Sequence, residues 1–157
     1  MAQRTRYQPI NPGKYSGSYP IVLKSSWERT FAQTYCDLNE SCLEWAYEPW
    51  RIPYRCPLTN RQTIYIPDFL MAFRGRDGSV KTALIEIKPL HETLQEHARN
   101  RKDAMVMTKN FAKWEAARAW CARRNNVEFV ILTEAELFGE NIKPRRRSTY
   151  RPRRVKK

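Results

Sequence analysis

Apolar residues follow a helical period early in the chain and a strand-like alternation after it. The helical spacing predicts a helix over residues 26–38. Its expected core face carries Trp27, Phe31, Tyr35 and Leu38. Alternating apolar residues between 45 and 66, interrupted by prolines, predict one or two short strands with bends and a loop at 56–62.

Two β-prone apolar runs, at 64–73 and 80–87, flank a cluster of turn-forming residues at 74–78. This arrangement predicts a β-hairpin. Because side chains alternate along a strand, Glu86 and Lys88 are expected on one face of the second strand, with their apolar neighbours on the other.

The remaining residues return to a helical pattern and end with one more strand. Residues 94–124 are predicted as helix, in two pieces broken near 108–110, with an amphipathic stripe in the second piece: Phe111, Trp114, Ala117 or Arg118, and Cys121. A buried strand at 127–132 follows. Thr133 and Glu136 then form a capping box for a short helix.

The strand–helix–strand order of the second half suits a right-handed crossover, which makes the strands at 80–88 and 127–132 parallel. The predicted fold class is therefore α/β, a mixed β-sheet flanked by helices in the order α-β-β-β-α-β. Residues 1–23, rich in proline and glycine, are expected to form an extended arm held by Tyr7, Tyr15 and Tyr19. Residues 24–142 form one predicted domain, and 143–157 a basic tail.

Positive charge is the strongest compositional feature of the chain, with a formal net charge of +13. The tail alone carries nine Lys and Arg residues and no acid. Such a segment commonly binds nucleic acid by neutralising phosphates, and an anionic protein or membrane surface is the alternative. No amphipathic apolar face accompanies the tail, so we expect double-stranded DNA and no membrane. The predicted DNA-binding residues are Lys143, Arg145, Arg146, Arg147, Arg151, Arg153, Arg154, Lys156 and Lys157.

The four cysteines form no C-x-x-C pair, and the two histidines are far from them in sequence. We therefore expect free, mostly buried thiols rather than a zinc site. The first residues lack the apolar block of a signal peptide, and no apolar run reaches the length of a membrane span. We expect the protein to act in the compartment in which it is made.

Three residues of the predicted hairpin carry candidate chemistry. Asp68 and Glu86 both lie at its open end, and Lys88 follows on the face of Glu86. Two neighbouring carboxylates repel each other, and a hard divalent cation with oxygen ligands would relieve this. With a lysine nearby, such a site suits phosphodiester cleavage. The alternative remains open, with Asp68 as a turn residue and Glu86 and Lys88 as an exposed pair.

Glu28 also has two interpretations. With Ser25 as N-cap it fits a capping box at the start of the first helix. It is also a candidate member of the acidic site.

Taken in order, these features resemble the PD-(D/E)xK nuclease superfamily, which has the restriction-endonuclease-like fold. More narrowly, the chain is similar to the head-completion nucleases of large tailed phages. The stretches that carry the resemblance lie within residues 14–17, 24–31, 52–54, 67–68, 85–89, 92–93, 113–117 and 129–134. The basic tail lies outside it.

The resemblance implies that Asp68 and Glu86 hold Mg²⁺ (or Mn²⁺), with the backbone carbonyl of Ile87 and the carboxylate of Glu28 as further ligands. It implies that Lys88 positions or activates the attacking water. The expected function is a metal-dependent endodeoxyribonuclease without sequence specificity, which acts in phage head completion after DNA packaging.

The resemblance also implies portal or neck proteins as partners, and the host cytoplasm and the virion as locations. One alternative is a structural component of the virion that binds DNA or the neck without cutting. A weaker alternative is a TnsA-type transposase subunit, since that type usually carries a further C-terminal domain for which the 15 residues of the tail leave no room.

Overall fold

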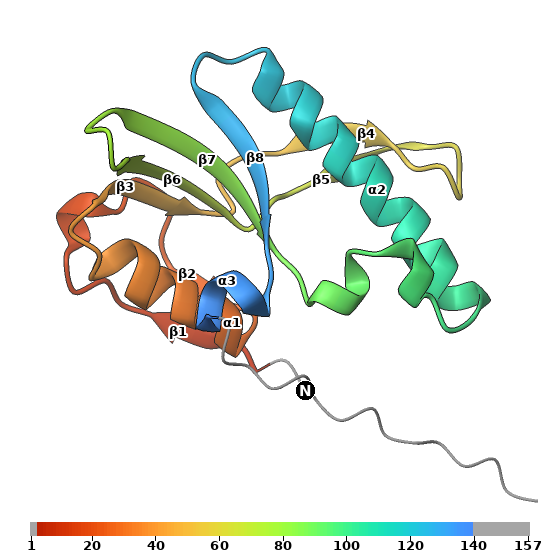
Figure 1. Ribbon diagram of the computed structural model, residues 1–157, viewed down its shortest axis with the longest axis horizontal. Helices are drawn as coiled ribbons and strands as arrows, with labels where there is room; N and C mark the ends of the chain where they lie inside the picture. The colour runs from red at the N-terminus through yellow and green to blue at the C-terminus, as the bar shows by residue number, and fades with distance from the viewer. Residues whose placement is uncertain (1–2, 140–157) are drawn as a thin grey trace, which may run out of the picture.

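The computed structural model describes residues 3–139, and a four-stranded mixed sheet forms its centre (Figure 1). The strand order is β3 (Cys42–Tyr47), β6 (Phe69–Arg74), β7 (Val80–Ile87) and β8 (Val127–Leu132). The first three strands are antiparallel neighbours, and β8 runs parallel to β7. The α/β fold class and the parallel crossover are thus confirmed.

The central hairpin pairs β6 with β7 in a continuous register from Phe69 opposite Ile85 to Arg74 opposite Val80. The turn is closed by a hydrogen bond from Gly75 N to Ser79 O of 2.8 Å. Gly78 has a φ of 81°, which a residue without a Cβ adopts at little cost. The predicted hairpin is therefore confirmed.

The apolar run at 64–73 is divided between two strands, contrary to the prediction of one. Gln62–Tyr65 forms β5, which pairs only with β4 (Ile52–Arg55) in a separate antiparallel sheet. The division falls at the buried Pro67, which has no N–H for a ladder hydrogen bond. Two short strands followed by a loop, as predicted for the preceding region, correspond to β3, β4 and the residues after them.

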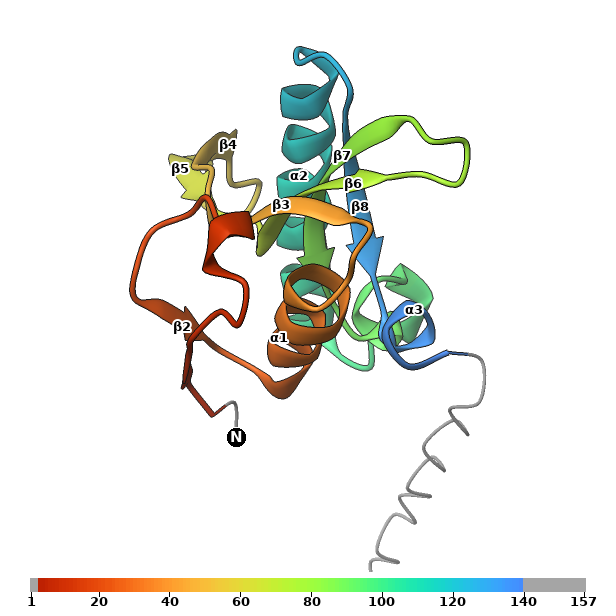
Figure 2. The same ribbon diagram turned by 90° about the vertical axis from the view of Figure 1, so that its left-hand side faces the viewer.

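The N-terminal segment is more regular than an extended arm. Thr5–Tyr7 (β1) pairs with Ile21–Leu23 (β2) in an antiparallel sheet, and Pro12–Lys14 forms a 3-10 turn, η1. Figure 2 shows this segment running beside β3, where Tyr15 bridges to Trp45. Tyr7 and Tyr15 are buried and hold the segment as predicted, whereas Tyr19 is 55% exposed.

The first helix changes its winding halfway. The α-helix α1 (Ser26–Thr30) continues as a π-helix, η2 (Phe31–Asp37), whose end is marked by a Leu38 N to Gln33 O bond of 2.9 Å across five residues. A π-turn holds more residues than an α-turn, so the facing of the side chains shifts. Leu38, which was predicted to face the core, is exposed, so that prediction is wrong. Ala32 and Cys36 are buried in its place.

The long helix α2 (Arg101–Ala122) is continuous, so the predicted break near 108–110 is wrong. The Thr108 hydroxyl donates to Ala104 O at 2.9 Å and is satisfied inside the helix. The helical prediction fails earlier in the chain. Two separate 3-10 turns, η3 (Leu90–Glu92) and η4 (Gln95–His97), come first, and α2 begins only after its N-cap Asn100. Phe111, predicted in the stripe, is 36% exposed. The buried residues of α2 are Met107, Asn110, Trp114, Ala117 and Cys121.

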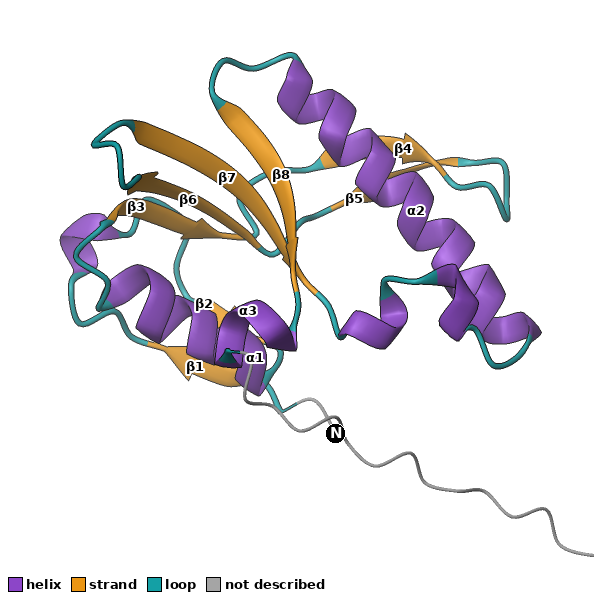
Figure 3. Ribbon diagram, in the orientation of Figure 1, coloured by secondary structure: helices purple, strands orange, loops and turns teal. Residues whose placement is uncertain are grey.

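Figure 3 shows the helices that flank the central sheet. Two hydrophobic clusters lie on opposite faces of this sheet. One joins α1, η2, the N-terminal segment and α3 (Glu134–Phe138) to β3, β6 and β7. The other joins α2 and the β4–β5 sheet to β7 and β8. The capping box of α3 is formed as predicted. The four cysteines are buried and free. Among residues 3–139, no helix has the length and apolar character to cross a membrane.

Candidate active site

The hairpin register brings Asp68 and Glu86 together. Phe69 lies opposite Ile85, so the residues one step outward, Asp68 and Glu86, face each other at the open end of β6 and β7. Asp68 Oδ2 accepts a hydrogen bond from Ile87 N at 2.8 Å, which fixes the carboxylate against β7. The two predicted acids therefore come from adjacent strands and share one corner of the sheet.

Lys88 projects to the same side as Glu86, as the alternation of a strand requires. Its Nζ lies 3.8 Å from Glu86 Oε1, and its side chain is 28% exposed. An ammonium group in this position stays accessible to a substrate while it faces the buried carboxylate. The predicted grouping of two acids and one lysine is thus present.

Glu28 is 7% exposed and belongs to both interpretations offered for it. Ser25 caps the helix by accepting from Glu28 N at 3.1 Å. The carboxylate, however, accepts from Lys24 N at 2.7 Å and from the Tyr47 hydroxyl at 2.9 Å, so the reciprocal half of the predicted capping box is replaced. Tyr47, which donates to Glu28, lies opposite Phe69 at the start of β6, and the charge of Glu28 contributes to raising the pKa of Asp68.

Two residues of the site were missed by the sequence analysis. Tyr65, at the end of β5, donates to Glu86 Oε2 at 2.7 Å. Lys113 of α2 places its Nζ 5.6 Å from the centre of the Tyr65 ring. For Lys113 the signals in the sequence were its place beside the core-facing Trp114 and within the stretch 113–117 that carries the family resemblance, but neither gave it a role. Nothing local linked Tyr65, 21 residues before Glu86, to that carboxylate.

The site concentrates negative charge in a poorly hydrated place. Burial, followed by the charge of Glu86, raises the pKa of Asp68 well above its usual range. Burial also raises the pKa of Glu86, although the Tyr65 hydroxyl and the charges of Lys88 and Lys113 oppose it. Burial, with the nearby positive charges of Lys109 and Lys88, lowers the pKa of Lys113.

The donor set fits a hard divalent cation. One oxygen each of Asp68, Glu28 and Glu86 is held by a backbone N–H or a tyrosine hydroxyl, and the other oxygen accepts no hydrogen bond from the described residues. Carboxylate oxygens are the ligands that Mg²⁺ and Mn²⁺ prefer, and a cation offsets the repulsion that raises these pKa values. Within residues 3–139 no three or more His, Cys, Asp and Glu side chains form a group that could hold a metal ion, so all the predicted ligands, Asp68, Glu86, Glu28 and the Ile87 carbonyl, stay predictions.

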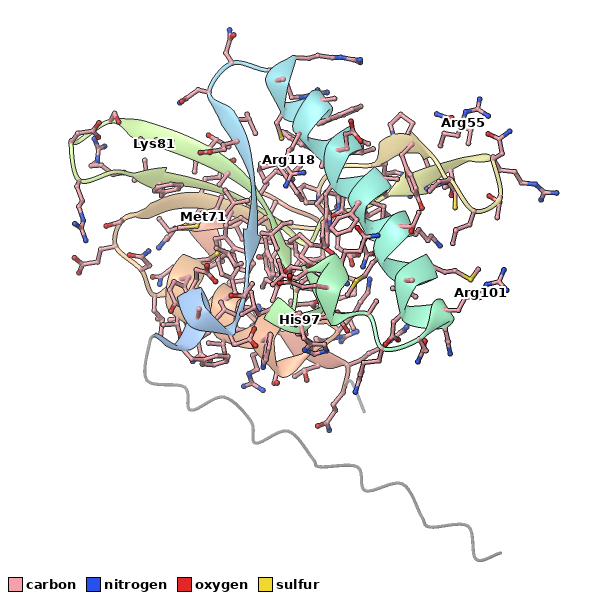
Figure 4. The ribbon with its side chains drawn as sticks, turned by 45° about the vertical axis from the view of Figure 1, so that its right-hand side comes forward. Arg55, Met71, Lys81, His97, Arg101 and Arg118 are labelled. Carbon is pink, nitrogen blue, oxygen red and sulfur yellow. The ribbon has the colours of Figure 1, made fainter. Side chains whose placement is uncertain are left out.

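The nine predicted DNA-binding residues of the tail, Lys143 to Lys157, lie outside the described residues. Within the described chain, basic residues lie on β4, its loop and α2. In Figure 4, Arg55 of β4 and Arg101 of α2 project from the same side of the molecule. The hairpin sheet at 51–65 contains three arginines and no acid.

Residues 39–134, more than half of the chain, match the family described as TnsA-like endonuclease N terminal. The matched segment contains β3 to β8 and therefore Asp68, Glu86, Lys88, Tyr65 and Lys113, whereas Glu28 precedes it. A comparison with curated proteins gives no match. The fold and the family agree with the restriction-endonuclease-like architecture and with nuclease-type activity on DNA. The chain belongs to the TnsA-like N-terminal endonuclease family, within the PD-(D/E)xK superfamily.

Proposed function

We propose that this protein is a metal-dependent endonuclease that hydrolyses phosphodiester bonds in double-stranded DNA with little sequence preference. The observation that carries the proposal is the corner where Asp68 and Glu86 meet with Lys88 at 3.8 Å from Glu86, within a chain of the TnsA-like family.

In this proposal Asp68 and Glu86, with the Ile87 carbonyl and Glu28, hold Mg²⁺ (or Mn²⁺). A cation held by these residues would supply a water of lowered pKa and would offset charge on the phosphate. Lys88 orients the water and stabilises negative charge on the phosphate oxygens.

Tyr65 holds one oxygen of Glu86, so that the other faces Lys88. Basic residues on β4, α2 and the tail supply affinity for the DNA backbone that is independent of sequence and falls with salt.

The test is cleavage of supercoiled plasmid with Mg²⁺ by the wild type and by Asp68→Asn and Lys88→Met. Matched controls are Asp77→Asn and Lys81→Met at the far end of the same hairpin, where both residues are exposed. We expect both site variants to lose at least about 100-fold in rate, as is common for groups that act on the transition state. Equal rates for the site variants and the controls would reject the assignment.

We further propose a role in phage head completion after DNA packaging, in the host cytoplasm and the virion, with portal or neck proteins as partners. The support is the resemblance of the ordered motifs. Complementation of a head-completion defect by the Asp68→Asn variant tests whether this role requires DNA cleavage or only a structural component. Failure to complement, together with normal production of the variant, supports a cutting enzyme, and rescue would favour a structural component.

The family match favours one second candidate, a TnsA-type transposase subunit. A transposase subunit acts at the defined ends of a mobile element. Mapping the cut positions on plasmid DNA separates the two roles, because cuts confined to one end sequence would favour the transposase subunit and dispersed cuts favour head completion.

A further inference from the structure

A cavity of about 200 Å³ lies between the connector after β7 and the first turns of α2. Its lining residues come from η3, η4, the segment between η4 and α2, and α2 itself, and are His91, Glu92, His97, Arg99, Asp103, Val106, Met107 and Asn110. Figure 4 shows His97 on η4, next to the N-terminal part of α2. The cavity takes no part in the chemistry derived for Asp68, Glu86 and Lys88.

Asn110 supplies a polar group on the inner side of this cavity. The residue is 6% exposed, yet its side-chain amide forms no hydrogen bond with the described residues. It lines the cavity, so its oxygen and its NH₂ group face the space. Its polar atoms are not among the fully buried atoms that lack a partner, so they are open to the cavity, where a guest that both donates and accepts could bond to them in place of water.

The charges of the lining disfavour a phosphate as that guest. The lining holds two carboxylates, Glu92 and Asp103, with one guanidinium, Arg99, and two imidazoles, and His91 Nε2 lies 4.0 Å from Glu92 Oε1. Asp103 Oδ2 is already engaged by Arg99, through the backbone N at 3.1 Å and Nε at 3.6 Å. An anion would therefore meet Glu92 with no unpaired guanidinium to receive it.

The cavity suits a flat, neutral and partly apolar group. Met107 is 5% exposed and Val106 lies at the rim, so one wall is apolar, while Asn110 presents a polar edge. A nucleobase has two apolar faces and an edge of donors and acceptors, and an asparagine amide pairs with such an edge in a bidentate manner.

Two residues that line the cavity are close in sequence to residues of the candidate active site. His91 follows Lys88 by three residues along the connector, and Asn110 precedes Lys113 by three residues on α2. Three helical residues correspond to a rise of about 4.5 Å. Asn110 and Lys113 are therefore neighbours on one face of α2, and Lys113 in turn lies over the ring of Tyr65, whose hydroxyl donates to Glu86.

We propose that this cavity receives an unstacked nucleobase of the strand that is being cut. The inference rests on the proposed nuclease function and narrows its substrate to DNA with a single-stranded or frayed segment at the cleavage site. Enzymes that take a base out of the stack expend less energy where the base is already unpaired, and a base held against the protein adds binding energy.

The test compares two labelled single strands of about 12 nucleotides, a length within the range of single-strand binding sites. One strand carries bases and the other is abasic, with the same phosphates. Binding to the full-length protein is measured by fluorescence anisotropy with EDTA present, so that no cutting is needed. The variants are Asn110→Leu, which removes the amide at similar volume, and Val106→Trp, which fills the cavity from its 49% exposed rim. The matched control is Asn125→Ala on an exposed residue.

The wild type and Asn125→Ala are expected to bind the base-containing strand at least about tenfold more tightly than the abasic strand. Asn110→Leu and Val106→Trp should lose most of this preference and keep their affinity for the abasic strand.

Equal affinity of the wild type for the two strands would overturn the proposal, as would variants that keep the preference or weaken both strands alike. Loss of plasmid cleavage is scored in a different assay, so the nuclease function and the base site can fail separately.

Discussion

At the scale of single residues, the site is an arrangement that folding alone would disfavour. Asp68 and Glu86 repel each other in a buried corner, and the pKa of each is raised, first of all by burial. Tyr65 and the backbone N–H of Ile87 each satisfy one oxygen. In the proposed function the remaining oxygens would bind a cation, and the site would exchange stability for activity, as catalytic centres commonly do.

Glu86→Gln is predicted to stabilise the metal-free protein at pH 7. A carboxyl with a raised pKa favours the folded state below its ordinary pKa, and this contribution is lost as the pH rises through the raised value. The wild type should therefore lose stability above about pH 4, and the variant less so. We expect a rise of about 2–4 °C in Tm.

Thermal denaturation across a pH series, with and without Mg²⁺, measures this effect. Mg²⁺ should raise the Tm of the wild type more than that of the variant. The control is Glu115→Gln on the exposed face of α2. A Tm that falls in Glu86→Gln and responds to Mg²⁺ as in the wild type would contradict the prediction.

Lys113→Met is predicted to shift the acid limb of the pH–rate profile to higher pH. The charge of Lys113 lowers the pKa of Glu86, so its removal leaves that carboxylate harder to ionise. The measurement is plasmid cleavage as a function of pH, in parallel with Lys102→Met, an exposed lysine on the same helix. If the two variants shared one profile, Lys113 would have no electrostatic role at the site.

At the scale of elements, one buried carboxylate ties the N-terminal segment to the first helix. Asp37, at the end of η2, is fully buried and accepts from the Tyr7 hydroxyl at 2.6 Å, Ile10 N at 2.7 Å and Asn11 N at 2.8 Å. Lys14 Nζ adds three hydrogen bonds to backbone carbonyls around it. These hydrogen bonds attach the N-terminal segment, which the sequence predicts as an extended arm, to the folded domain.

Asp37→Asn is predicted to lower the Tm by about 5 °C at pH 7, because one oxygen acceptor becomes a donor facing donors. Burial raises the pKa of Asp37, but its hydrogen bonds lower it by more, so the net pKa is below the usual value. The carboxylate therefore stabilises the fold above the ordinary pKa, and this stability is lost as the pH falls through the lowered value.

The measurement is thermal denaturation at pH 7 and at about pH 3, where the difference between wild type and variant should shrink. Asp77→Asn in the exposed hairpin turn is the control. A difference that stays constant down to the lower pH would show that ionisation of Asp37 is not what holds the segment.

At the scale of the whole molecule, charge is divided between a catalytic body and a strongly basic tail. The tail holds nine of the 29 Lys and Arg residues, so it dominates the net charge of +13. Basic side chains on β4 and α2 lie on the body itself. Backbone affinity for DNA is then expected from both parts, with the tail as the larger contributor.

Removal of residues 143–157 is predicted to weaken DNA binding and to flatten its salt dependence. Each phosphate that the protein no longer neutralises reduces the slope of log K against log salt by about 0.9. Anisotropy titrations with duplex DNA at several salt concentrations measure the slope, and the Tm, expected to stay within about 2 °C, reports on the fold. An unchanged slope would show that the tail serves another purpose.

Local signals were sufficient for most elements. Period-two alternation around a turn cluster predicts the hairpin that carries Asp68 and Glu86, and the Thr133 capping box predicts α3. Local signals failed where long-range packing decides the outcome. The pairing of β1 with β2 and the anchoring of Tyr7 by Asp37 join residues far apart in the sequence. The continuity of α2 is a different case, because the Thr108 hydroxyl is satisfied locally by Ala104 O.

The sequence by itself determined the α/β order and the charge of the tail, and alternation along one hairpin was enough to predict that Asp68, Glu86 and Lys88 lie together. Only the tertiary structure brought Tyr65 and Lys113 to Glu86 and left the amide of Asn110 facing a cavity. These placements depend on how β5 and α2 pack against the sheet, and no periodicity within a segment encodes the distance between segments.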